Sequence, residues 1–291
     1  MQNFSIAGFT VAIDEGILKY KYIANILENF SAHSDGNLPL LTVKIGKVAD
    51  FDECEYSITF DEMGIESCFL REGNTFFRKM ISEETSLRCE FFENENNNFE
   101  TTVEFTAGAK LGTMLYYLLR WVCCFAFLHR QALGFHASTV VYKEKSLVFL
   151  GKSGTGKSTH SQLWQENIGE VELLNDDAPF VQIIDNKVLT WGSPWSGKTP
   201  CYKNKSTQTA AFVLLEQAAE NKIHKLSLYE ALAVLLGSSR FYYFNDEFFT
   251  DKNYEIISEI LKKIPVYHLQ CLPDADAVNL VLETLKRDNI L

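Results

Sequence analysis

The stretch of sequence that decides the fold runs from residue 146 to residue 158 and reads SLVFLGKSGTGKS. Its first part, Leu147–Leu150, is a short apolar run of the kind that forms a buried strand, and Gly151 ends it. The segment from Ser158 to Gln165 is compatible with a helix. A strand, a glycine-rich loop and a helix in this order predict an α/β fold for this part of the chain.

The loop in the middle of this stretch matches the pattern G-x-x-x-x-G-K-[ST] over residues 151–158. Glycines adopt backbone angles that are closed to other residues, so amide groups can converge on a phosphate, and the helix that follows directs its positive dipole end at the same anion. The pattern predicts that Lys157 reaches the β- and γ-phosphates and that Ser158 binds Mg²⁺. The predicted nucleotide-binding residues are Gly151, Ser153, Gly154, Thr155, Gly156, Lys157, Ser158 and Thr159.

A pair of adjacent carboxylates follows the next predicted strand, where residues 173–178 read LLNDDA. One of Asp176 and Asp177 can bind Mg²⁺, and the other can accept a proton from a substrate hydroxyl group. Adjacent residues of a strand point to opposite faces, so both carboxylates face one site only at a bulge or a strand end.

Strands and helices alternate through the rest of the second half of the chain, which indicates an α/β domain. Apolar or alternating runs predict strands at residues 137–142, 146–150, 171–174, 179–184, 188–191, 210–215 and 266–271. Three further helices are predicted: one begins at the capping box Ser227–Glu230, one spans 256–264 and ends at Pro265, and one begins at Asp274.

Residues 1–105 form a smaller β-rich α+β region, in which no catalytic cluster is recognisable. Strands are predicted at 40–45, 56–60, 86–92 and 101–105, a helix within 17–30, and a hairpin loop at 94–98. We expect the second domain to span 106–291 and to begin with a helix over about 108–130. The apolar window 111–128 carries Arg120 at its middle and is short for a membrane span, so a buried helix is expected.

The charge balance disfavours two classes of partner. The chain has 291 residues with 27 basic and 38 acidic side chains, a net charge of −11, which argues against nucleic acid and anionic membrane surfaces. Seven scattered cysteines without a CxxC pair predict free thiols in a reducing compartment. The N-terminal residues show no basic stretch followed by a long apolar one, so a cytoplasmic location is expected.

Four segments together resemble one known superfamily. They are GFHASTVV at 134–141, GKSGTGKST at 151–159, LLNDDAP at 173–179 and WGSPWSGK at 191–198. This arrangement resembles the HPr kinase / phosphoenolpyruvate carboxykinase superfamily and, more narrowly, the HPr-kinase-related proteins, some of which are tailoring kinases of ribosomally made peptides. The resemblance covers about residues 134–285. It implies a P-loop kinase domain with a mixed sheet, ATP and Mg²⁺ as cofactors, and a possible homo-oligomer.

The resemblance also implies roles for individual residues. His136 would lie beside the catalytic aspartate, Asp176 would act as the base, and Asp177 would bind the metal together with Ser158, with the roles of the two aspartates open to exchange. Lys198 would be a cation that faces the phosphates.

Two further observations concern the acceptor side of the site. Arg240 is a candidate for stabilising charge on the transferring phosphoryl group, although an ordinary helix-end arginine explains it equally well. The glutamate–arginine signature of true HPr kinases and their docking motif for HPr are absent, which argues against HPr itself as the substrate. Lys203 and Lys205 either guide an acidic substrate or belong to a charged loop.

The sequence therefore predicts an ATP- and Mg²⁺-dependent kinase that phosphorylates a serine- or threonine-type hydroxyl group of a peptide or protein. Two alternatives stay open at this point. One is a small-metabolite kinase or carboxykinase-like enzyme with the same core, and the other is a non-catalytic nucleotide-binding regulatory protein.

Overall fold

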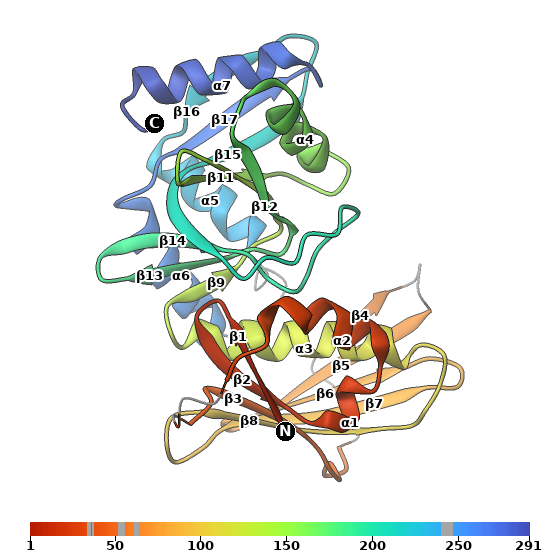
Figure 1. Cartoon of the computed structure of the whole chain (residues 1–291). Coiled ribbons are helices and arrows are strands. Elements are labelled where there is room, and N and C mark those ends of the chain that lie inside the picture. The colour runs from red at the N-terminus through yellow and green to blue at the C-terminus, as the bar shows by residue number, and fades with distance from the viewer. Residues whose placement is uncertain (34–35, 37, 52–55, 61–63, 240–246) are drawn as a thin grey trace. The chain divides into compact units, whose positions relative to one another are not determined.

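The chain folds into two compact units, Met1–Ala126 and Phe127–Leu291 (Figure 1). The computed structural model describes the chain apart from residues 34–35, 37, 52–55, 61–63 and 240–246. The predicted boundary at 105/106 lies one helix before this division. Helix α3 (Leu111–Leu128) falls almost entirely in the first unit, because its side chains pack on the sheet of that unit.

The first unit is built on a mixed sheet. Strand β3 runs parallel to both of its neighbours, β2 and β8, and the other neighbouring strands are antiparallel. From one edge to the other, its described strands are β1 (Gln2–Ile6), β2 (Phe9–Ile13), β3 (Leu41–Ile45), β8 (Phe99–Phe105), β7 (Ser86–Glu93), β6 (Thr75–Ile81), β5 (Ile65–Glu72) and β4 (Tyr56–Phe60).

Helix α3 covers one face of this sheet (Figure 1). The Trp121 ring lies 5.4 Å from the Phe69 ring and 6.1 Å from the Phe91 ring, and Phe125 packs edge-on against Phe91. By length and composition α3 is apolar enough to cross a membrane, with a mean hydropathy of 1.6, but 78% of it is buried inside the protein. The apolar residues of α3 therefore form part of the core of the first unit.

The first half of the chain contains more strands than the sequence predicts. The predicted strands correspond to β3, β4, β7 and β8, whereas β1, β2, β5 and β6 were not foreseen. The β1–β2 hairpin turns through Ala7 and Gly8, both at positive φ, and this pair lacks the usual Asn-Gly or Asp-Gly signal. The predicted helix within 17–30 is divided into α1 (Glu15–Leu18), α2 (Lys21–Leu27) and the 3₁₀ turn η1 (Glu28–Phe30).

One cysteine departs from the expectation of free thiols. Cys68, on β5, is disulfide-bonded, so that expectation is wrong at this position. The free cysteines among the described residues are Cys89, Cys123, Cys124, Cys201 and Cys271.

The second unit contains a second mixed sheet. Strand β15 runs parallel to β11 on one side and to β17 on the other, and the remaining pairs are antiparallel. The strands in order are β12 (Val171–Asp177), β10 (Ala137–Tyr142), β11 (Lys145–Leu150), β15 (Ser206–Gln217), β14 (Lys187–Trp191), β13 (Phe180–Ile184) and β9 (Ala132–Gly134), with β17 (Val266–Cys271) beside β15 and β16 (Lys222–Lys225) beside β17.

The helices of the second unit complete a large apolar core. Helices α4 (Lys157–Asn167) and α7 (Ala275–Arg287) lie together against the sheet, where Trp164, Phe149 and Val281 are fully buried. Helices α5 (Leu228–Ser238) and α6 (Glu247–Leu261) pack on each other. Among the described residues of this half the predicted strands and helices are present, but α6 begins at Glu247 and ends at Leu261, and the short β9 and β16 were not predicted.

The packing of α3 on the first sheet can be tested at Phe91, which is 2% exposed. We expect Phe91→Ala to lower the free energy of unfolding of the first unit by about 3–5 kcal/mol, because the vacated space is lined by aromatic rings that cannot close it. Urea denaturation measures the change. The matched control is Tyr229→Ala at a side chain that is 85% exposed, with an expected change below about 0.5 kcal/mol. An unchanged urea midpoint for Phe91→Ala would contradict this packing.

Candidate functional site

The glycine-rich loop connects the end of β11 to the start of α4, as the sequence predicts. Gly151, Gly154 and Gly156 have φ angles of 149°, 82° and 104°, in the region that favours glycine. At Gly151 an added Cβ would lie 3.2 Å from the Leu215 carbonyl oxygen, so the loop also passes close to β15. Gly156 caps α4 without a side-chain hydrogen bond, so the first amide groups of this helix have no side-chain acceptor from the cap.

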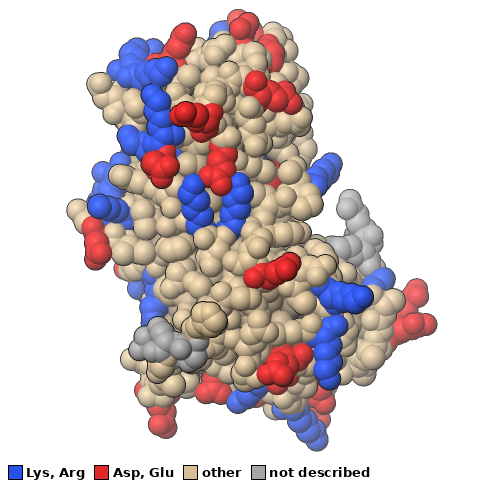
Figure 2. Space-filling view, in the orientation of Figure 1, with Lys and Arg blue, Asp and Glu red and all other residues tan. Residues whose placement is uncertain are grey.

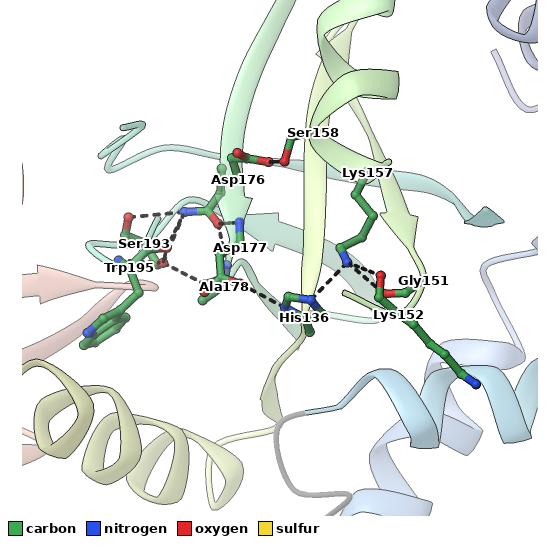
Figure 3. Close-up of polar contacts among 11 residues, drawn as sticks. His136, Gly151, Lys152, Lys157, Ser158, Asp176, Asp177, Ala178, Ser193 and Trp195 are labelled. Atoms are coloured by element: carbon green, nitrogen blue, oxygen red, sulfur yellow. Dashed lines mark hydrogen bonds and ion pairs between the residues drawn. The ribbon is translucent and has the colours of Figure 1, made fainter. Parts of the chain in front are cut away.

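Lys157 turns its ammonium group back into this loop (Figure 3). The Nζ atom donates to the carbonyl oxygens of Gly151, at 2.8 Å, and Lys152, at 3.2 Å. It also lies 3.0 Å from Nε2 of His136, which precedes β10. The side chain is buried, and these three acceptors hold its ammonium group in position.

His136 connects Lys157 to one of the two carboxylates. Its Nδ1 lies 2.9 Å from Oδ1 of Asp177. A lysine ammonium group only donates hydrogen bonds, so His136 Nε2 accepts from Lys157, and Nδ1 carries the proton and donates to Asp177. The Asp177 side chain is 19% exposed and the His136 side chain 35%, so a substrate can reach the pair.

Asp176 makes a separate contact with the start of α4. The Ser158 hydroxyl group donates to Asp176 Oδ1 at 2.8 Å, and the amide of Thr199 donates to Asp176 Oδ2 at 3.3 Å. The sequence assignment placed Ser158 with Asp177, whereas the structure pairs Ser158 with Asp176 and Asp177 with His136 (Figure 3).

Asp177 is the last residue of β12, and the strand is irregular just before the two carboxylates. In the pairing of β12 with β10, Leu173 faces Val140 but Asn175 faces Thr139, so Leu174 is an extra residue in the ladder. Such a bulge changes the direction of the side chains that follow it. This agrees with the requirement, drawn from the sequence, for a bulge or a strand end.

The segment 192–205 runs beside the end of β12. The Gly197 amide donates to the Asp176 carbonyl oxygen, and Ser196 forms an isolated bridge with Asp177. Lys198, predicted to face the phosphates, is exposed and makes no hydrogen bond or ion pair with any described residue. Arg240 lies outside the described residues.

Lys203 and Lys205 of the same segment are paired with one carboxylate. Their Nζ atoms each lie 2.7 Å from an oxygen of Glu172, and these contacts lower the pKa of that carboxyl group. On the face of the second unit shown in Figure 2, acidic and basic side chains likewise lie side by side. The two lysines are therefore partly neutralised, in agreement with the interpretation as a charged loop.

Ser158 and Asp176 offer two oxygen ligands to a divalent cation. No group of three or more His, Cys, Asp and Glu side chains in the described parts of the chain could hold a metal by itself. Mg²⁺ typically uses one or two carboxylates and takes its other ligands from water and substrate phosphates. The Ser158–Asp176 pair fits such an ion beside the glycine-rich loop.

The comparisons with known proteins give a distant relation in fold. No protein-family model and no curated protein matches the sequence. Among solved structures, the Hpr(Ser) kinase/phosphatase from Coxiella burnetii matches with 11% identity and a TM-score of 0.30. The match covers 54% of this chain and 95% of that protein. The roles of the residues must therefore be argued from the geometry of this chain.

A second histidine, His160 on α4, packs below the site. It accepts a hydrogen bond from Trp164 Nε1 at 3.2 Å and lies edge-on against Phe149. Burial lowers the pKa of His160 from 6.5 to about 4, so it is neutral at pH 7. His160 therefore packs α4 against the sheet as a buried, neutral side chain.

The burial of His160 predicts a pH dependence of stability. The unfolded chain binds a proton at a higher pH than the folded chain, so stability is lost as pH falls from 6.5 toward 4. Between pH 7 and pH 5 this histidine is expected to cost about 2 kcal/mol. His160→Gln keeps an acceptor for Trp164 and should remove this loss in urea titrations, whereas the exposed control His33→Gln should retain it. Equal pH dependence in His160→Gln and the wild type would contradict the assignment.

Proposed function

We propose that this chain is an ATP- and Mg²⁺-dependent kinase that transfers the γ-phosphoryl group to a hydroxyl group of a peptide or protein. One observation carries the proposal. The first two residues of the helix after a glycine-rich loop are linked to two neighbouring carboxylates: Lys157 through His136 to Asp177, and Ser158 directly to Asp176. Phosphoryl transfer needs these three functions together: anion binding, metal binding and a proton acceptor.

The loop and Lys157 would bind the phosphates of the nucleotide. The amide groups of the loop and the first turn of α4 supply hydrogen-bond donors, and the helix dipole favours negative charge at this point. Lys157 already lies at the loop, bound to two neutral carbonyl groups and to His136. Charged phosphate oxygens are stronger acceptors than these neutral groups, so Lys157 would turn from His136 to the nucleotide.

Ser158 and Asp176 would hold the magnesium ion. When bound, this ion would neutralise charge on the phosphates. Asp176 is preferred to Asp177 for this role because Asp176 lies at hydrogen-bond distance from Ser158. This exchanges the two roles assigned from the sequence.

Asp177, oriented by His136, would accept the proton of the acceptor hydroxyl group. The hydroxyl oxygen attacks the γ-phosphorus, its proton passes to the Asp177 carboxylate, and the bond between the γ-phosphorus and the bridging oxygen breaks to release ADP. The hydrogen bond from His136 Nδ1 would orient the Asp177 carboxylate for this step. Lys198, exposed beside these carboxylates on the segment 192–205, is a candidate for contact with the acceptor.

Labelled ATP and a set of serine- and threonine-containing peptides test the proposal. Asp177→Asn preserves an acceptor for His136 but removes the basic carboxylate, so transfer should fall about 10²- to 10⁴-fold while nucleotide binding is retained. Lys157→Met should instead weaken ATP binding by calorimetry. The control is Lys187→Ala, at an exposed residue of the β13–β14 hairpin, which should match the wild type. An absence of transfer to any hydroxyl substrate by the wild type, or full activity in Asp177→Asn, would refute the assignment.

The assignment of the metal ligands has its own test. Ser158→Ala and Asp176→Asn should each raise the Mg²⁺ concentration needed for half-maximal transfer by about 10- to 100-fold, because the first removes an oxygen ligand and the second removes the negative charge of one. Initial rates measured over a Mg²⁺ series give this value. Gln162→Ala, on an exposed part of α4 where Gln162 pairs with Glu166, is the control. If Asp177→Asn shifted the Mg²⁺ response and Asp176→Asn did not, the two roles would be reversed.

A further inference from the structure

Asn175, immediately before the two carboxylates, is fully buried and uses both ends of its amide. Its Oδ1 accepts from the backbone amides of Asp177, at 3.2 Å, and Ala178, at 2.8 Å. Its Nδ2 donates toward the carbonyl oxygens of Ser193, at 3.3 Å, and Trp195, at 3.1 Å. One side chain therefore joins the end of β12 to the start of the segment 192–205.

Ser193 completes the same connection from the other side. Its hydroxyl group donates to the Ala178 carbonyl oxygen at 2.7 Å and lies 3.2 Å from Asn175 Nδ2. The Trp195 amide donates to the Ser193 hydroxyl oxygen at 3.2 Å. Ser193 is fully buried and Trp195 nearly so, which means that water cannot replace a lost partner without opening the packing.

Both carboxylates depend on the backbone that this pair of side chains holds. The amide of Asp177 is bound by Asn175 directly. Asp176 receives its second contact from the Thr199 amide, on the segment whose start is fixed at residues 193 and 195. Neither Asn175 nor Ser193 is hydrogen-bonded to Lys157 or to the loop 151–156.

We propose that Asn175 and Ser193 are positioning residues that hold Asp176 and Asp177 in register for phosphoryl transfer. The inference rests on the proposed function and assigns no contact with substrate to either residue. The rate of a reaction falls steeply when the reacting groups are misplaced, and a displacement of about 1 Å can lower it about 10²-fold. Removal of the amide leaves two backbone amides and two carbonyl groups without their partner, so the end of β12 is expected to move.

A double-mutant cycle with alanine substitutions at Asn175 and Ser193, made in the full chain, tests the positioning role. Asn175→Ala should lower kcat for phosphoryl transfer about 10²-fold, while KM for ATP changes less than about twofold, because the phosphate-binding loop is untouched. Ser193→Ala, the milder change, should lower kcat about 10-fold. The double variant should be no slower than about the Asn175→Ala variant, since both changes release the same connection.

A buried pair in the same sheet serves as the matched control. The hydroxyl groups of Thr190 and Thr209 lie 2.7 Å apart between β14 and β15, and neither side chain is hydrogen-bonded to Asp176 or Asp177. Thr190→Val and Thr209→Val should lower the melting temperature without changing kcat at temperatures where the protein is folded. A purely structural role for Asn175 predicts this same behaviour for Asn175→Ala.

The outcomes separate this inference from the function on which it rests. A wild type that transfers phosphate, with kcat of Asn175→Ala and Ser193→Ala within threefold of its value, overturns the inference alone. Effects of the two substitutions that multiply in the double variant also overturn it. If Asn175→Ala does not fold, Ser193→Ala decides by itself through kcat and KM. No transfer by the wild type overturns both the function and the positioning role.

Discussion

The hydrogen-bonded chain from Lys157 through His136 to Asp177 is the interaction on which the site depends. It joins three pieces of the second unit: the first turn of α4, the residue before β10, and the end of β12. A buried ammonium group is costly unless its donors are satisfied, and here two loop carbonyl groups and one imidazole nitrogen satisfy them. The glycine-rich loop is thereby bound to the carboxylates, although they are distant in sequence.

The two aspartates have different surroundings despite being adjacent. Asp176 is 3% exposed and lies between Ser158 and the Thr199 amide, whereas Asp177 is more open and faces His136. The extra residue in β12 and the amide of Asn175 produce this difference by setting the backbone at the strand end. Adjacent acids in different environments can take different roles, and this is the physical basis for the proposed separation of metal binding from proton transfer.

The second half of the chain was well predicted because its signals are local. The apolar run 147–150, the Ser227 capping box and the stop at Pro265 each act within a few residues, and β11, α5 and α6 follow them. The first half was less predictable. The sequence predicts a buried apolar helix at Leu111–Leu128, but no local signal shows which sheet this helix packs on. It packs on the preceding sheet, so the boundary between the two units lies later than the predicted one. The bonded state of Cys68 is likewise a matter of spatial proximity.

The sequence by itself determined the strand, glycine-rich loop and helix over residues 146–167, because backbone freedom at Gly151, Gly154 and Gly156 and apolar strand residues act at short range. It also identified the residue types that suit the proposed binding of phosphate and transfer of a proton. Only the tertiary structure decided that Ser158 meets Asp176, that His136 meets Asp177, and that Asn175 and Ser193 hold the backbone between them. These pairings depend on strand register and on a bulge, and register is set by packing over the whole sheet.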